Sequence, residues 1–274
     1  MSEEPKEYQQ PPEVKPHALL KKLEKEFNRS IPPEYQAFKN FEFVTSGAPY
    51  SQFLKDYLFI DYTSQPKDDI FEQISFEDDH NERHRAFLPK IEELKKFIDE
   101  HPESLTEFAK LLQTKIRGGR IVDLGAGYEA APIMQRYSAI FDAKEYIGID
   151  RAHDSTAQQH ENTTTYRLQG DNLHVVAAMP DNSVDVFHLS GLENYPDDTS
   201  AQQYCDYLIK EMTRVLKADG IVVVGQGSFG FNTTAQFEKY GLEKYVSQRS
   251  ISSDNLDEAT YQGQDFYWVY KKKQ

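Results

Sequence analysis

Short apolar segments alternate along the second half of the chain with segments whose apolar residues recur every three or four positions. The first pattern is typical of buried β-strands and the second of amphipathic helices. The strand-like segments are 121–124, 145–150, 164–168, 221–225 and 265–270, with one more strand after the turn at 180–182. The clearest helix covers 201–216, because its apolar residues form one stripe from Tyr204 to Leu216. This alternation predicts an α/β fold in which helices cover both faces of a parallel sheet.

The first half of the chain has a different pattern. Residues 1–16 are rich in Pro, Glu and Gln, a composition that predicts a disordered tail. Residues 17–117 are expected to form a mainly helical extension, in which 31–62 is rich in aromatic residues. The helices expected in it cover 17–27, 83–100 and 102–117. The aromatic segment is expected to cap a ligand cleft, to pack on the second domain (118–274), or to do both.

The segment from Ile121 to Gly127 contains the strongest candidate for a ligand site. A strand there ends in Asp123 and is followed by Gly125 and Gly127. Glycines after a strand allow a tight turn and let the backbone approach a nucleotide-like ligand closely. Two glycines alone are weak evidence, because many ordinary turns contain them.

Two further acids follow strands in the same way. Asp150 ends the second strand 23 residues after Gly127, close to the spacing of an acid that binds ribose in a strand–helix–strand unit. A carboxylate only accepts hydrogen bonds, so it can hold both hydroxyls of a cis-diol. The Asp-Ser-Thr sequence at 154–156 is expected to cap the next helix, and Asp171 follows the third strand.

These features together resemble the class I S-adenosylmethionine-dependent methyltransferase family. The resemblance covers about 118 to 274, and its most specific parts are PDNSVDVF at 180–187 and EMTRVLKADGIVVV at 211–224. It implies a seven-stranded, mostly parallel, doubly wound Rossmann-like sheet whose last strand is antiparallel. It also implies that S-adenosyl-L-methionine binds across the carboxyl ends of the first strands and leaves as S-adenosyl-L-homocysteine.

The resemblance assigns roles to particular residues. Those implied at the methionine end of the cofactor are Asp123, Gly125, Ala126 and Gly127. Asp150, with Arg151 beside it, would bind the ribose hydroxyls. Asp171 would bind the adenine amino group, with Asn172 and Leu173 alongside. The residues implied near the sulfonium and the acceptor are Leu189, Ser190 and Gly191.

One position departs from the family pattern. Family members often carry a third glycine two residues after the second, and this chain has Glu129 there. A glutamate at this place either binds the amino group of the cofactor or repels its carboxylate. A catalytically inactive binding or regulatory module with the same fold therefore stays an alternative.

The methyl acceptor is not fixed by these motifs. An alcohol or protonated amine needs a base, and the candidates are Glu193, Tyr195 and His188. His188 is expected to point into the sheet, because its neighbours on the strand face the other way. The segment 190–195 lacks the double proline of nucleic-acid amino-methyltransferases, so a small-molecule acceptor is preferred and a protein acceptor comes second.

A nicotinamide-dependent oxidoreductase is a further alternative, since such enzymes also combine a glycine turn with a ribose-binding acid. Residues 217–224 follow the methyltransferase pattern instead, and no Tyr-x-x-x-Lys pair stands out in a suitable place.

Charge and composition narrow the partners. The chain has 31 basic and 45 acidic residues, a formal charge of −14 that disfavours nucleic acid. Cys205 is the only cysteine, so no internal disulfide forms and a reducing compartment is permitted. No apolar run reaches the roughly 18 residues of a membrane span, and no secretory signal is evident, so we expect a cytoplasmic protein. His80 and His84 lie four residues apart without the zinc-protease order, which predicts a charged helix start and no metal site.

Overall fold

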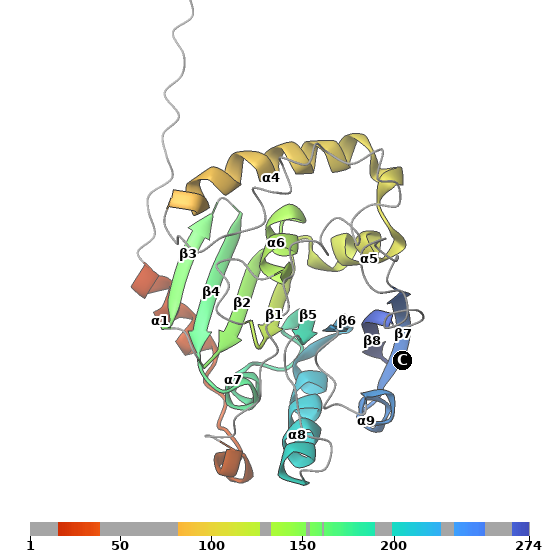
Figure 1. Ribbon diagram of the computed structural model, residues 1–274. Helices are drawn as coiled ribbons and strands as arrows, with labels where there is room; N and C mark the ends of the chain where they lie inside the picture. The colour runs from red at the N-terminus through yellow and green to blue at the C-terminus, as the bar shows by residue number, and fades with distance from the viewer. Residues whose placement is uncertain are drawn as a thin grey trace, which may run out of the picture.

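One eight-stranded sheet runs through the described part of the molecule (Figure 1). The computed structural model describes residues 16–38, 82–126, 133–151, 154–160, 162–189, 199–225, 233–249 and 265–273. The strands are, in chain order, β1 (Arg120–Leu124), β2 (Glu145–Asp150), β3 (Thr156–His160), β4 (Thr163–Gln169), β5 (Val184–Leu189), β6 (Leu216–Gly225), β7 (Leu242–Arg249) and β8 (Asp265–Lys272). Their order across the sheet is β3-β4-β2-β1-β5-β6-β8-β7.

The strand directions match the sequence prediction. Strands β4, β2, β1, β5 and β6 pair in parallel, whereas β8 pairs antiparallel to both β6 and β7. A mostly parallel sheet with an antiparallel last strand is thereby confirmed. The additional strand is β3, which pairs antiparallel to β4 at the edge. The helix expected after 154–156 is wrong, because the chain enters β3 there instead.

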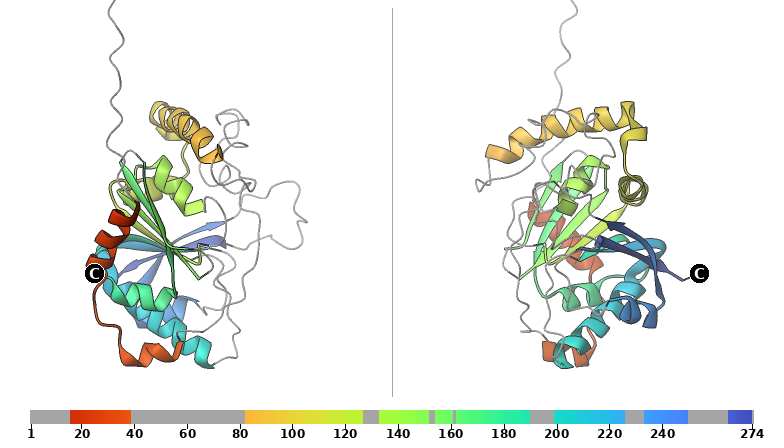
Figure 2. Two further views of the ribbon diagram at one scale, coloured as in Figure 1. Left: turned by 90° about the vertical axis from the view of Figure 1, so that its left-hand side faces the viewer. Right: turned by 45° about the vertical axis from the view of Figure 1, so that its right-hand side comes forward.

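Helices lie on both sides of the sheet, as Figure 2 shows edge-on. They are α1 (Pro16–Glu26), η1 (Pro33–Phe38), α4 (Glu82–Glu100), η3 (Pro102–Ser104), α5 (Glu107–Ile116), α6 (Ile133–Ile140), α7 (Asn172–Ala178), α8 (Thr199–Val215) and α9 (Thr233–Lys239). One apolar cluster joins α1, α7, α8 and α9 to one face, and a second joins α4, α5 and α6 to the other. Strand alternation produces the two clusters: Val122 and Leu124 belong to the first, and Ile121 to the second.

The N-terminal segment 16–38 is bound to the sheet domain by buried and partly buried contacts. The Arg120 guanidinium donates to both carboxylate oxygens of Glu26, at 2.5 and 3.0 Å, and to Glu145 at 2.6 Å. Tyr35 is fully buried, and its hydroxyl donates to Glu211 on α8 at 2.9 Å. Burial and the Glu211 carboxylate raise the pKa of Tyr35, so this hydroxyl keeps its proton.

These contacts bear on the predicted extension. The described aromatic residues of the segment 31–62 pack into the core, as Tyr35 and Phe38 do. Positions 39–62 lie outside the described residues, so the cap over a cleft stays a prediction. That residues 17–117 form a unit of their own likewise stays a prediction. None of the described helices has the length and apolar character needed to cross a membrane.

Candidate functional site

The turn after β1 has the geometry that its glycine motif predicts. Gly125 has a φ of +73°, a left-handed conformation that favours glycine. The backbone amides of Gly125 and Ala126 donate to the carbonyl of Ile149 at 3.0 and 3.2 Å. The turn is therefore fixed against the carboxyl end of β2. Gly127 and Glu129 lie outside the described residues.

Gly148 in β2 allows the turn to approach this closely. A Cβ at this position would lie 3.0 Å from the Tyr146 hydroxyl oxygen and 3.1 Å from the Cβ of Ala126. Both distances are shorter than ordinary van der Waals contact. Gly148 was not among the predicted site residues. The signal for it in the sequence is a glycine inside a strand, two residues before Asp150 and between two isoleucines.

A buried polar cluster lies where β1 and β5 run side by side. Asp123 is the register partner of His188, and its Oδ1 lies 2.7 Å from His188 Nδ1. The Tyr146 hydroxyl donates to Asp123 Oδ2 at 2.8 Å. Burial raises the pKa of Tyr146 well above its usual value, and the Asp123 charge and hydrogen bond add to this rise. The tyrosine therefore stays a proton donor. We call this trio the Asp123 corner.

The Asp123 corner lies at the topological switch point of the sheet. The chain fills the sheet from β1 through β2 to β4 on one side, and from β5 to β6 on the other. In open α/β sheets, ligands bind outside the carboxyl ends of the strands at this point. The predicted methionine-end residues Asp123, Gly125 and Ala126 come together here.

His188 points away from Phe187 and Leu189, as strand alternation predicts, because those two belong to the opposite core cluster. Only 1% of its surface is exposed, and one ring nitrogen is engaged by Asp123. A catalytic role for His188 stays a prediction. The other residues predicted near the reacting atoms lie outside the described residues: Ser190, Gly191, Glu193 and Tyr195.

A second polar cluster forms where β4 ends and α7 begins. Asp171 is the N-cap of α7, and its Oδ1 accepts from the backbone amide of His174 at 3.1 Å and contacts His174 Nδ1 at 2.8 Å. Its Oδ2 accepts from Arg151 Nη2 at 2.5 Å and from the Tyr204 hydroxyl at 3.1 Å. We call these four residues the Asp171 corner.

Tyr204 reaches the Asp171 corner from α8. Burial raises its pKa well above the usual value, and the nearby Asp171 charge adds to the rise, so the hydroxyl remains protonated. The same hydroxyl oxygen accepts from the backbone amide of Leu173 at 3.2 Å. Leu173 itself is fully buried in the core. The sequence pattern predicts Tyr204 as a core residue of the helix, and its contact with Asp171 was missed.

Asp150 lies at the carboxyl end of β2, between the two corners. It is partly buried, and its carbonyl accepts from the backbone amide of Gly170 at 3.0 Å. Since β2 lies between β1 and β4, the ends of three adjacent parallel strands carry Asp123, Asp150 and Asp171 in sequence order. These are the three acids that the family resemblance assigns to the cofactor.

Among the described residues, two side-chain atoms beside Asp171 are buried and have no hydrogen-bond partner. They are Asn172 Oδ1 and His174 Nε2. Buried polar atoms are nearly always paired, so orphaned ones indicate a missing partner. An adenine base offers both donors and acceptors, and the residues at this corner therefore fit the adenine end of the predicted cofactor.

A cavity of about 660 Å³ adjoins the Asp171 corner. Apolar side chains of α1, β4 and α7 form much of its wall, including Leu20, Leu168 and Val175. Arg151, Asp171 and His174 supply polar groups to the same cavity. A mainly apolar hollow of this size with a few polar groups is typical of a small-molecule site.

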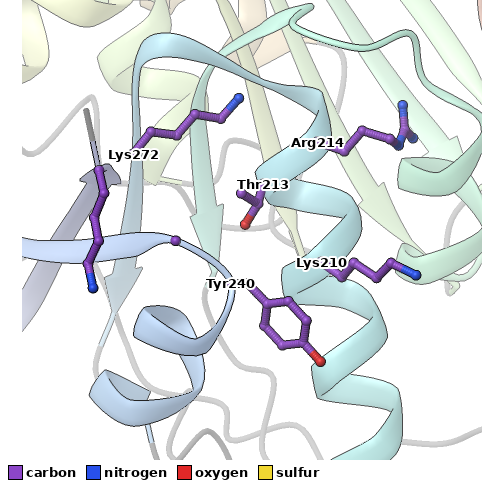
Figure 3. Close-up of a pocket in the computed structure, with 7 residues that line it drawn as sticks. Lys210, Thr213, Arg214, Tyr240 and Lys272 are labelled. Carbon is purple, nitrogen blue, oxygen red and sulfur yellow. The ribbon is translucent and has the colours of Figure 1, made fainter.

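A second pocket, of about 480 Å³, has a basic lining and lies between α8, the turn at Tyr240 and the end of β8 (Figure 3). Its cations do not converge: the side chains of Lys210 and Arg214 extend to one side of α8, away from Tyr240. The Arg214 guanidinium is also already bound to Glu211 and to α7 carbonyls. None of the predicted site residues lines it. Among the described residues, no group of His, Cys, Asp and Glu is arranged for a metal ion, and His80 and His84 lie outside them.

Comparison with known proteins finds no matching family model and no matching curated protein. Among solved structures, the chain is similar to a protein from Listeria monocytogenes assigned to the S-adenosylmethionine-dependent methyltransferases, with 12% identity and a TM-score of 0.44 over 61% of this chain and 96% of that one. It is also similar to a TehB-like SAM-dependent methyltransferase from Corynebacterium glutamicum, with 16% identity and a TM-score of 0.36 over 69% and 100% of the two chains.

Similarities at this level carry no conclusion about activity or substrate. The fold follows instead from the strand order, the parallel pairing of β4, β2, β1, β5 and β6, and the antiparallel last strand. The chain has the fold of the class I S-adenosylmethionine-dependent methyltransferases.

Proposed function

We propose that this protein is an S-adenosylmethionine-dependent methyltransferase. The observation that carries the proposal is the glycine turn at Gly125, placed at the switch point next to three acids on successive parallel strands. A turn of this kind admits a ligand close to the backbone, and acids at strand ends bind amino and hydroxyl groups. Cofactor and acceptor are both part of the proposal.

Each acid has a distinct task in this proposal. Asp123, with Gly125, Ala126 and Gly127, holds the methionine end. A carboxylate has about four lone-pair sites, and Tyr146 and His188 use two of those on Asp123, so capacity is left for an ammonium group. Asp150 binds the ribose hydroxyls, with Arg151 beside it.

The Asp171 corner binds the adenine end of the cofactor in this proposal. Asp171 faces the amino group, and Asn172 and Leu173 border the base. Asn172 Oδ1 is a buried acceptor that the base could satisfy. Leu189, Ser190 and Gly191, at and after the end of β5, border the sulfonium and the acceptor.

The cofactor would supply a methyl group already activated for displacement. The chain aligns the acceptor in line with that methyl group and excludes water from it. Glu193 or Tyr195, which follow β5 in the sequence, is proposed to remove the acceptor proton where one must leave. His188 is the third candidate and would act from inside the sheet, held at Nδ1 by Asp123.

A small molecule is the proposed acceptor, with a protein as the alternative. The net charge of −14 disfavours nucleic acid and other polyanions as acceptors. Transfer of a labelled methyl group to cell extract separates the two classes. Label in the fraction that passes a small-pore filter supports the proposal, and label only in the retained protein supports the alternative.

The cofactor is tested by calorimetric titration with S-adenosylmethionine and S-adenosylhomocysteine, with NAD as control. We expect micromolar binding of the first two, lost in Asp150→Ala and retained in Asp154→Ala, which removes an exposed acid nearby. Heat with NAD alone would favour the oxidoreductase alternative. No binding by the folded wild type would leave the inactive-module alternative, with Glu129 as the suspected cause.

A further inference from the structure

The carboxylate of Asp171 has no free acceptor site. About four lone-pair sites are available on a carboxylate, two on each oxygen. The His174 amide and ring take those of Oδ1, while Arg151 and Tyr204 take those of Oδ2. An adenine amino group that binds Asp171 must therefore replace one of these four donors.

Arg151 is the donor that can leave. The His174 amide belongs to the first turn of α7, and Tyr204 is fully buried, so neither can move without disturbing the core. The His174 ring is only 13% exposed and contacts the same Oδ1 as its own amide, so it has less freedom than Arg151. The Arg151 side chain is 34% exposed, and it also lines the 660 Å³ cavity, which offers room for another rotamer. The Asp171 side chain is only 5% exposed, so the exchange depends on Arg151, whose partly exposed guanidinium can move into water when a ligand takes its place.

We propose that Arg151 competes with the adenine amino group for Asp171, and that this competition sets the affinity and the purine selectivity of the site. The proposal rests on the proposed cofactor. Binding of the adenine end is then coupled to release of the Arg151–Asp171 ion pair. The apparent affinity equals the intrinsic affinity multiplied by the fraction of molecules in which the pair is broken.

Selectivity follows from the group on purine carbon 6. Adenine has an amino donor there, which needs Asp171 free of Arg151. Hypoxanthine has a carbonyl acceptor, which a second N–H of the Arg151 guanidinium can bind while the ion pair stays intact. Wild-type protein is therefore expected to discriminate poorly between the two bases, although Asp171 alone would favour adenine.

The test compares S-adenosylhomocysteine with its hypoxanthine analogue by calorimetry on the full-length protein. In Arg151→Ala we expect S-adenosylhomocysteine to bind about five- to tenfold tighter, because the competing donor is gone. The hypoxanthine analogue should bind about five- to tenfold more weakly, because its carbonyl loses a charged donor. Opposite changes for two such similar ligands cannot arise from partial unfolding.

Two further variants serve as controls for Arg151→Ala. Arg117→Ala removes an exposed arginine that precedes β1, at the other end of the strands, and should leave both affinities unchanged. Arg151→Gln keeps a neutral donor and should shift both affinities in the same directions by less. It replaces Arg151→Ala if that variant does not fold.

The outcomes separate this inference from the proposed function. Equal S-adenosylhomocysteine affinity in wild type and both Arg151 variants would overturn the competition alone. Weaker binding of both ligands in the Arg151 variants would also overturn it, and would make Arg151 a supporting residue. Absence of binding to the folded wild type and to every variant would remove the proposed function, and this inference with it.

Discussion

The two polar corners at the carboxyl edge of the sheet are built from the same residue types and differ in access. At each, an aspartate meets a tyrosine hydroxyl and the Nδ1 of a histidine. Asp123 is 1% exposed and has lone pairs to spare, but its partners enclose it. Asp171 is 8% exposed, adjoins a cavity and has every lone pair in use.

This difference teaches what makes a carboxylate available to a ligand. An enclosed carboxylate with spare acceptor capacity, such as Asp123, is held in place by its partners and can be reached by a ligand only from the turn beside it. A carboxylate beside a cavity whose lone pairs are all in use, such as Asp171, favours exchange: a ligand binds by displacing a mobile partner such as Arg151. The two corners should therefore respond differently to substitution: loss of Asp123 should lower stability as well as ligand binding, whereas loss of Asp171 should act chiefly on ligand binding.

The largest effect is expected from the paired substitutions Asp123→Ala and Asp171→Ala. The first removes the acceptor of the buried Tyr146 hydroxyl and the carboxylate partner of His188 Nδ1, and should lower the free energy of unfolding by about 3–5 kcal/mol. The second removes an N-cap and a tyrosine contact, and also the contacts to His174 Nδ1 and Arg151, whose side chains are partly exposed and can bind water instead; it should cost about 2 kcal/mol. Urea denaturation followed by circular dichroism measures both.

Asp219→Ala is the control, since that side chain is 81% exposed and should change stability by less than about 0.5 kcal/mol. Asp123→Asn keeps the shape and one acceptor oxygen, and should recover part of the loss. Equal costs for the two alanine variants would contradict the contrast between the corners.

The sequence predicted the positions of the acids but not their partners. Asp123 and Asp150 each end an apolar run, and Asp171 follows a strand, so each was assigned to the same edge of a parallel sheet from the chain alone. Tyr204 is separated from Asp171 by 33 residues and meets it only because α8 packs against α7. Such contacts depend on register and packing between elements, which periodicity does not encode.

The edge strand β3 shows the same limit for the fold. Asp-Ser-Thr at 154–156 has the composition of a helix cap, and Thr156–His160 lacks an alternating apolar pattern. The segment pairs with β4 and is covered by α1, with Ala157 buried beneath it. A strand stabilised by its neighbours carries little signal in its own residues.

Gly148→Ala should have an intermediate effect on stability, and it tests whether the glycine turn must lie close to the Asp123 corner. The added Cβ would meet the Tyr146 hydroxyl and Ala126 at once, so it should push apart the turn and the tyrosine. We expect a loss of about 1–3 kcal/mol in unfolding free energy. Gly118→Ala is the matched control for space, because no atom lies within 4 Å of its Cβ, although its φ of +66° carries its own strain. A Gly148→Ala variant as stable as wild type would show that the turn can move freely.

The smallest expected effect is a loss of stability in alkali that both corners share. Burial raises the pKa of Tyr146 and of Tyr204 in the folded protein, whereas an unfolded tyrosine titrates near 10. The folded state then holds the proton more tightly, so its stabilising contribution is complete below pH 10 and declines as the pH rises further. Because each tyrosine ionises in the unfolded state but not in the folded state, it should lower the free energy of unfolding by about 0.8 kcal/mol between pH 9 and 10.5.

Tyr146→Phe and Tyr204→Phe should each reduce the loss of unfolding free energy between pH 9 and 10.5 by about 0.8 kcal/mol. This reduction is expected whatever the effect of each substitution on stability at neutral pH. Tyr245→Phe, at a half-exposed tyrosine, should leave the decline as in wild type. Denaturation at pH 7, 9 and 10.5 measures the slopes. Because both tyrosines donate to an aspartate, equal slopes are expected even though the two corners differ in access. Another outcome is that Tyr146→Phe reduces the decline in unfolding free energy and Tyr204→Phe does not. Tyr204 would then ionise as easily in the folded as in the unfolded state. The whole Asp171 corner would in that case open to solvent, rather than only the Arg151 side chain moving away.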